Sequence, residues 1–146
     1  MKLQFSTEID LPFNKVRDQF NKELFIYLAP PMIPFKLKRF DGCLKGNEVH
    51  IKLGFEPFTQ EWISLITFEE TNHQGWSFID EGRLLPWPLK LWKHHHRVEI
   101  ISDQRCRIVD DITYECYPSI LTRVIKPFLW SVFAIRPRRY KKFFQG

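Results

Sequence analysis

The sequence predicts an α+β fold in which a curved antiparallel sheet of about six or seven strands wraps around one long C-terminal helix. In residues 34–117 apolar and polar side chains alternate, which is typical of strands with one buried face. In residues 118–144 the apolar side chains instead recur at helical spacing. A long amphipathic helix that follows a run of strands packs against the concave face of their sheet, and such an arrangement favours a cavity between them.

The N-terminal segment adds one strand and two short helices. Residues 2–10 alternate cleanly and predict a half-buried strand with one face made of Leu3, Phe5, Thr7 and Ile9. Pro12 suits the first position of a helix, and the apolar spacing that follows fits two short helices. Pro30 and Pro31 end the second of them.

The alternating region contains six further strands, with glycine or polar residues at the turns between them. They are expected at residues 35–40, 47–55, 60–70, 75–82, 89–101 and 106–117. In the final helix, Pro127 is expected to cause a bend or to begin a second helix, and Pro137 to disturb the helix end.

Length and composition favour a single domain, residues 1–146, with a core of ordinary size. No apolar run has the length of a signal peptide or a membrane span, so we expect a soluble, cytoplasmic protein. The cysteines match no zinc-binding spacing and are expected to be reduced thiols: Cys43, Cys106 and Cys116. The sequence lacks the motifs of serine hydrolases, P-loops, dinucleotide binding and nucleic-acid binding, so we expect no cofactor and no nucleic-acid partner.

The net charge of +5 is concentrated near the C-terminus. Residues 136–144 contain no acid and carry the basic side chains Arg136, Arg138, Arg139, Lys141 and Lys142. Such a segment either lies in solvent as a helix end, where cations favour the helix dipole, or contacts phosphates or anionic lipid. A weak contact with an anionic membrane is therefore one hypothesis for a partner.

Three consecutive histidines are the strongest candidates for chemistry in the sequence. Because neighbouring residues on a strand point to opposite faces, His94 and His96 share one face and His95 points away. The face of His94 and His96 also carries Trp92, Val98 and Ile100, so we assign it to the interior. The three histidines therefore do not converge on one metal ion.

The next strand places one acidic side chain on the same interior face. If the hairpin turns around Asp103, the facing pairs are Trp92 with Tyr114, His94 with Ile112, and His96 with Asp110. A buried carboxylate needs a partner because an unpaired one is costly. The pair would raise the pKa of His96 and lower that of Asp110.

Three interpretations of this cluster remain open. The first is a satisfied polar pair inside an aromatic wall, and the second is a pair that binds a ligand in a cavity. The third is a metal site of His94 and His96, which needs a third ligand such as Asp110 or Asp80. Asp80 shares an apolar face with Trp76 and Phe78, although it is also close to the end of its strand. We expect no metal.

The order of these motifs resembles the START-like, or SRPBCC, superfamily, whose fold is called helix-grip. A Trp-x-His-x-His strand of its small bacterial members is matched by Trp92, His94 and His96, and an Asp-x-hydrophobic-x-Tyr strand by Asp110, Ile112 and Tyr114. The stretches EIDLPFNKVRDQF, LAPP and FID also resemble family segments, so the resemblance covers nearly the whole chain. Residues 82–92 depart from the usual Gly-Pro-aromatic turn by a longer insertion, which is expected to reshape the cavity mouth.

The resemblance implies an apolar cavity between the sheet and the C-terminal helix. Members bind lipids, sterols, polyketides or plant hormones, and some are cyclases. We therefore expect binding of a small lipid-, sterol- or polyketide-like ligand without turnover. The expected ligand-binding residues are Trp62, Trp76, Phe78, Trp92, His94, His96, Asp110, Tyr114, Leu129 and Phe133. The alternative is a cyclase- or dehydratase-type enzyme, with His96 and Asp110 as the general acid–base pair and Tyr114 as a hydrogen-bond donor.

Overall fold

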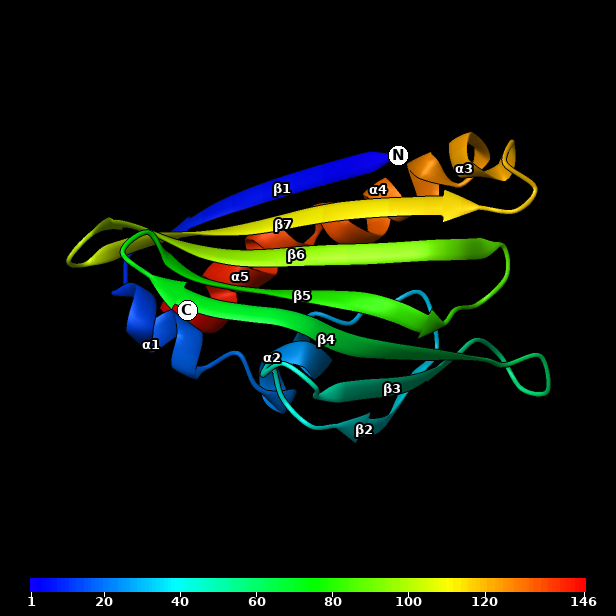
Figure 1. The fold of residues 1–146 in the computed structure, drawn as a ribbon, viewed down its shortest axis with the longest axis horizontal. Helices are drawn as coiled ribbons and strands as arrows, with labels where there is room; N and C mark the ends of the chain where they lie inside the picture. The colour runs from blue at the N-terminus through cyan, green and yellow to red at the C-terminus, as the bar shows by residue number, and fades with distance from the viewer.

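The computed structural model describes residues 1–146 and is built on a curved antiparallel sheet of seven strands (Figure 1). The strands are β1 (Lys2–Ile9), β2 (Phe35–Phe40), β3 (Glu48–Leu53), β4 (Gln60–Asn72), β5 (Gly75–Leu84), β6 (Leu89–Ser102) and β7 (Arg105–Cys116). Their order across the sheet is β1-β7-β6-β5-β4-β3-β2, so only β1 pairs with a strand distant in sequence. The predicted α+β class and antiparallel sheet are confirmed.

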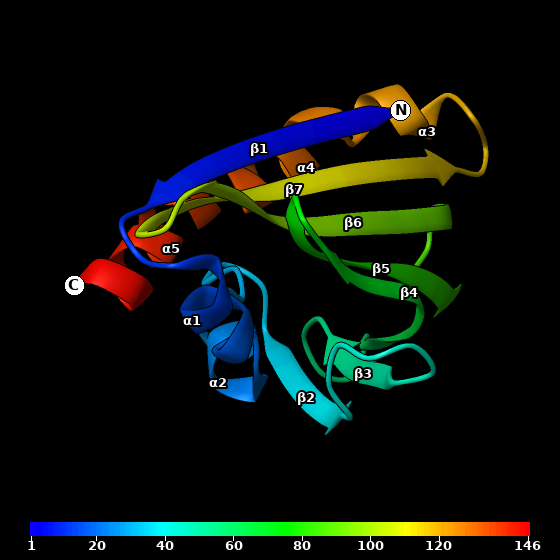
Figure 2. The same ribbon diagram turned by 60° about the vertical axis from the view of Figure 1, so that its left-hand side comes forward.

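Five helices cover the concave face of the sheet or close its ends. They are α1 (Phe13–Asp18), α2 (Lys22–Tyr27), α3 (Leu121–Val124), α4 (Lys126–Ala134) and α5 (Arg136–Gln145). Figure 2 shows α4 and α5 crossing the sheet on the side of β1 and β7, with α1 and α2 beside α5. None of the helices combines the length and hydropathy that crossing a bilayer requires.

The C-terminal helical segment differs from the single long helix that the apolar stripe predicts. It is divided at Ile125 and Ile135, and a proline lies in the first turn of each following helix. A proline lacks an amide hydrogen and therefore suits a helix start better than a helix interior. Pro127 begins a second helix, one of its two predicted effects, whereas Pro137 begins α5 rather than disturbing the end of a helix.

Local sequence signals account for the two short N-terminal helices. Pro12 precedes α1, and the side chain of Asn21 caps α2 by accepting a hydrogen bond from the amide of Leu24 at 3.1 Å. Each helix buries one apolar side chain under the sheet, Val16 from α1 and Leu24 from α2. These contacts hold the two helices across one end of the concave face.

The predicted register of β6 and β7 is confirmed. The facing pairs are Trp92 with Tyr114, His94 with Ile112, and His96 with Asp110. On the other side of β6, Asp80 of β5 faces His94. The three central strands therefore place two histidines and two carboxylates on one patch of the concave face.

Strand β4 contains a bulge that breaks the alternation of inward and outward side chains expected from its sequence. Simple alternation places Phe68 on the inner face with Trp62, Ser64 and Ile66. The register of β4 against β5 shifts between Ile66 and Phe68, and Phe68 is 38% exposed. One extra residue in a strand reverses the face of every side chain beyond it, and the sequence carries no signal for the bulge.

The buried core consists of two apolar clusters on the concave side. One lies under α1, α2 and α5 and includes Val16, Leu24 and Trp76. The other lies under α3 and α4 and includes Trp92 and Tyr114. The three cysteines are unpaired, and two of them are fully buried, Cys106 and Cys116.

Candidate ligand-binding cavity

A cavity of about 440 Å³ lies between the concave face of the sheet and the helices. Of its 37 lining residues, 25 are hydrophobic. This volume is in the range of small-molecule sites, which are mostly apolar with a few polar groups at fixed positions. The walls come from β2–β6, α2, α4 and the start of α5.

Seven of the ten predicted ligand-binding side chains line the cavity: Trp62, Phe78, Trp92, His94, His96, Leu129 and Phe133. They are packed against one another as well as facing the space between them. The rings of Trp62 and Trp92 meet edge to face at a centroid distance of 4.8 Å. The ring of Phe78 stacks on that of His96 at 4.3 Å. Their contact with a ligand stays a prediction.

The other three predicted residues lie outside the cavity lining. Trp76 is buried and donates from its indole nitrogen to Glu69 at 2.8 Å. Tyr114 is buried beneath α3, and its hydroxyl donates to the carbonyl oxygen of Thr122 at 2.9 Å. Asp110 lies behind the two histidines. Strand alternation identified the correct face for all three, but it does not show which parts of that face the helices cover.

Several lining residues were not among the predicted ones. The inward side of β3 contributes Val49, Ile51 and Leu53, whose alternation is visible in the sequence. The insertion in residues 82–92 contributes Pro86, Trp87 and Pro88, and Trp87 is 69% exposed. Arg136 also reaches the cavity, although its surrounding sequence resembles a solvent-exposed basic tail.

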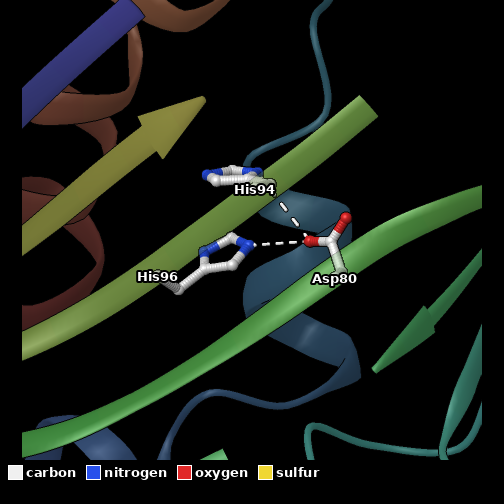
Figure 3. A group of neighbouring side chains, drawn as sticks. All are labelled: Asp80, His94 and His96. Carbon is white, nitrogen blue, oxygen red and sulfur yellow. Dashed lines mark hydrogen bonds and ion pairs between the residues drawn. The ribbon is translucent and has the colours of Figure 1, made fainter. Parts of the chain in front are cut away.

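Asp80, His94 and His96 form a polar patch in the wall of this otherwise apolar cavity (Figure 3). Oδ2 of Asp80 lies 2.9 Å from Nε2 of His96 and 3.8 Å from Nδ1 of His94. The two imidazole rings are stacked with centroids 3.6 Å apart. One carboxylate oxygen of β5 thus faces a nitrogen of each interior histidine of β6.

A second carboxylate lies on the opposite side of the two rings. Oδ1 of Asp110 lies 2.8 Å from Nε2 of His94, 3.4 Å from Nδ1 of His96 and 3.2 Å from Nη1 of Arg136. Tyr140 donates its hydroxyl to the same oxygen at 3.4 Å. The nearest histidine partner of Asp110 is therefore His94 and not the predicted His96. The backbone register is as expected, but the His96 side chain turns its Nε2 towards Asp80.

These contacts move the pKa values of the two histidines in opposite directions. Burial and the neighbouring charge of His96 lower the pKa of His94 to about 4, against the opposing effect of its two carboxylates. Burial also acts to lower the pKa of His96, but its contacts with Asp110 and Asp80 outweigh burial and raise it. Of the two histidines, His96 is therefore the one whose environment stabilises the protonated form better.

Both carboxylates are stabilised in the ionised form. Burial opposes this, but the charge of Arg136 and the two histidines hold the pKa of Asp110 well below its usual range. For Asp80, the hydrogen bond from His96 and the histidine charges likewise outweigh burial and lower the pKa. The patch thus presents charged hydrogen-bonding groups in an otherwise apolar wall.

No protein-family model matches the chain, and no curated protein matches it. Among solved structures, norcoclaurine synthase from Thalictrum flavum superposes with a TM-score of 0.70 at 11% identity, over 98% of this chain and 85% of that chain. An aromatase/cyclase from a Streptomyces species superposes with a TM-score of 0.69 at 8% identity, over 95% of this chain and 90% of that chain. The chain has the helix-grip fold.

A third helix-grip structure, a protein from Mycobacterium smegmatis, superposes with a TM-score of 0.66 at 16% identity, over 97% of this chain and 89% of that chain. Identities this low establish the fold alone. Because one fold supports many functions, the function of this helix-grip protein is argued from its cavity.

Proposed function

We propose that this helix-grip protein binds a small, mostly apolar ligand in the cavity between its sheet and C-terminal helices. The observation that carries the proposal is a cavity of about 440 Å³ with 25 hydrophobic residues among the 37 that line it. Moving apolar ligand surface out of water contributes roughly 25 cal/mol per Å² to binding. A lipid-, sterol- or polyketide-like molecule offers such a surface.

The polar patch narrows the chemistry of the ligand. Arg136 reaches the cavity wall and uses only Nη1 to bond Asp110, so its guanidinium has further N–H donors, whereas Asp80 and Asp110 already accept hydrogen bonds from the protein. An oxygen atom of a carbonyl, carboxylate or phenolate group is therefore a better partner than an amine. The ligand is expected to place its one oxygen-rich end on this patch and its apolar body along the aromatic wall.

Native mass spectrometry of the purified protein, beside a spectrum of the denatured protein, tests the proposal. A small additional mass that disappears on denaturation identifies a bound ligand and its class. Titration with the dye ANS tests the cavity when the protein is isolated without ligand, and we expect saturable binding at one site. If the protein shows no bound mass and no saturable dye binding, the proposal of an accessible apolar cavity is wrong.

A second candidate is a cyclase- or dehydratase-type enzyme. The observation that favours it is the direct hydrogen bond between His96 and Asp80 in the cavity wall, which places a proton donor beside the space where a ligand would lie. Asp80 replaces Asp110 as the immediate partner of His96 in this version. The hydroxyl of Tyr114 is bonded to Thr122 and has no place in it.

The two candidates are separated by looking for product formation after incubation with polyketide-like or other enolisable ligands. An enzyme would lose turnover in His96→Ala while keeping its fold, and it would be unaffected by Tyr114→Phe apart from stability. A binding protein would return every ligand unchanged. A wild-type rate in His96→Ala would rule out the acid–base role of that side chain.

A further inference from the structure

The side chains of Asp80, His94 and His96 converge at one point of the cavity wall. The potential ligand atoms, one from each residue, all lie within 4.8 Å of one another. In sequence, His94 and His96 are a strand pair that needs a third ligand, for which Asp110 and Asp80 are both candidates. The structure supplies that ligand, because Asp80 of β5 faces His94 of β6 in the sheet register.

The hydrogen bonds of the cluster leave one electron pair without a donor. A carboxylate accepts only, so Nε2 of His94 donates to Asp110 at 2.8 Å, and Nδ1 of His94 carries a lone pair. That lone pair faces Oδ2 of Asp80 at 3.8 Å and makes no hydrogen bond. His96 makes a hydrogen bond to the same oxygen of Asp80. The contact between His94 and that oxygen has no proton.

We propose that Asp80, His94 and His96 bind one divalent transition-metal ion, of the Zn²⁺ class, and leave at least one coordination position open to the cavity. Zinc–ligand bonds of about 2.0–2.2 Å in a tetrahedral site place neighbouring ligand atoms roughly 3.3 Å apart. The distances from Oδ2 of Asp80, 2.9 Å to His96 and 3.8 Å to His94, lie on either side of that value. Two imidazoles and one carboxylate are a ligand set that Zn²⁺ and similar ions accept.

Asp110 supplies the support that metal-binding histidines need. Metal-bound imidazoles usually donate their other ring N–H to a carboxylate, which fixes the ring orientation. Of the nitrogens that face away from the proposed ion, Nε2 of His94 donates to Oδ1 of Asp110 at 2.8 Å. Nδ1 of His96 lies 3.4 Å from the same oxygen and makes no hydrogen bond. Arg136 and Tyr140 in turn hold Asp110. The two rings are thus held between two carboxylates, one of them free to coordinate.

Metal binding displaces the proton that Nε2 of His96 shares with Asp80. With both histidines neutral, Asp80 and Asp110 against Arg136 then leave one excess negative charge, which favours the cation. A divalent ion changes this to one excess positive charge, which a bound hydroxide or an anionic ligand oxygen balances. Metal binding would therefore draw an oxygen-rich ligand end to the same patch.

The test uses ligand-free wild-type protein that a chelator has stripped of metal. We expect one equivalent of Co²⁺ to bind and to give the visible absorption bands of a low-symmetry site, and one equivalent of Zn²⁺ to displace it. Asp80→Asn is expected to weaken Zn²⁺ binding at least 100-fold, and Asp110→Asn by 10- to 100-fold. His73→Ala is the matched control, because His73 is exposed in the β4–β5 turn. The Zn²⁺ affinity of this variant is expected to equal that of the wild type.

X-ray absorption spectroscopy of the Zn²⁺-loaded wild type is a second test, and it does not depend on whether the variants fold. It is expected to show imidazole nitrogen and oxygen ligands and no sulfur. Substoichiometric Co²⁺ binding, sulfur coordination, or Zn²⁺ affinity that survives Asp80→Asn in a folded protein would overturn the site. Because dye binding to the cavity is measured separately on stripped protein, failure of the metal site and failure of apolar-ligand binding are distinguishable.

Discussion

The guanidinium of Arg136 lies 3.2 Å from the carboxylate of Asp110, and the two side chains are only 14% and 2% exposed. The pair joins the first turn of α5 to the centre of β7. It also balances the charge behind the histidines, so it stabilises the fold and the polar patch together. A residue of the basic C-terminal segment is therefore part of the buried centre of the protein.

Replacing Arg136 is expected to destabilise the protein strongly. Arg136→Met leaves Asp110 buried without its cation, and breaking a buried pair in this way costs about 3–5 kcal/mol. Arg138→Met is the control, since Arg138 is exposed and such a change usually alters stability by less than about 0.5 kcal/mol. Urea denaturation measures both variants. Equal midpoints for the two would contradict the importance of the buried pair.

Filling the cavity is expected to block the binding of apolar molecules. Ile51 lines the cavity, whereas Lys52, the next residue of β3, does not. Ile51→Trp should lower the affinity for ANS at least tenfold because the indole occupies ligand space, and Lys52→Trp should leave it nearly unchanged. Fluorescence titration gives both affinities, and circular dichroism checks that both variants fold. An equal effect of the two substitutions would place dye binding elsewhere.

The cavity-facing thiol is expected to react slowly. Burial raises the pKa of Cys43 to about 12, with smaller contributions from Asp80 and Glu69, and only the thiolate is nucleophilic. The thiolate fraction is therefore very small at pH 8 and rises roughly tenfold with each pH unit below that pKa.

Iodoacetamide labelling followed by mass spectrometry checks this expectation. The folded protein should remain largely unlabelled at pH 8, and all three thiols should react in urea. Labelling of native Cys43 at the rate of a free cysteine would contradict the raised pKa of its thiol. Labelling that increases as the pH falls would contradict the upward direction of the shift.

The structure reduces the basic segment to three exposed cations. Arg136 is paired with Asp110, and Arg139 donates to the backbone carbonyls of Tyr27 and Ala29, which leaves Arg138, Lys141 and Lys142 on the surface. If this face contacts anionic lipid, each cation near the membrane contributes about 1 kcal/mol at low salt. Replacing all three by glutamate should then abolish sedimentation with phosphatidylserine-containing vesicles.

The control for membrane contact carries the same kind of change at the sheet edge. Lys36→Glu with Lys38→Glu alters two exposed cations of β2 and should leave vesicle binding largely intact. Binding by the wild type should weaken as salt rises, since salt screens exposed charges. A wild type that stays in the supernatant at low salt would end the membrane hypothesis.

Much of the sheet could be predicted because alternation directly reports which side chains face inward. The β6–β7 register followed from one assumed turn position, and it brought His96 opposite Asp110. The side-chain contacts did not follow from the register. His96 hydrogen-bonds to Asp80 on the other neighbouring strand, because each inner residue of a central strand has two neighbours and the sequence does not rank them.

The sequence also could not show which parts of the sheet the C-terminal helices cover. Tyr114 is on the predicted face, but α3 occupies that end of the sheet and takes the tyrosine hydroxyl. Arg136 belongs to a stretch with the composition of a protein surface. It is nevertheless the first residue of α5, and its side chain points into the interior towards Asp110. Which patch a helix covers depends on where the chain returns in space, and local periodicity contains no information on that point.

The position of β1 in the sheet has a consequence for biosynthesis. Strand β1 pairs only with β7, so the backbone of Lys2 stays unpaired until Thr113 has been synthesised. The helices α4 and α5, which cover the cavity, are made later still. During translation the concave apolar face is therefore open to the surroundings for most of the time the ribosome needs to make the chain, and pairing of such distant segments is slow. Apolar surface that stays exposed in this way makes an unfinished chain prone to aggregation.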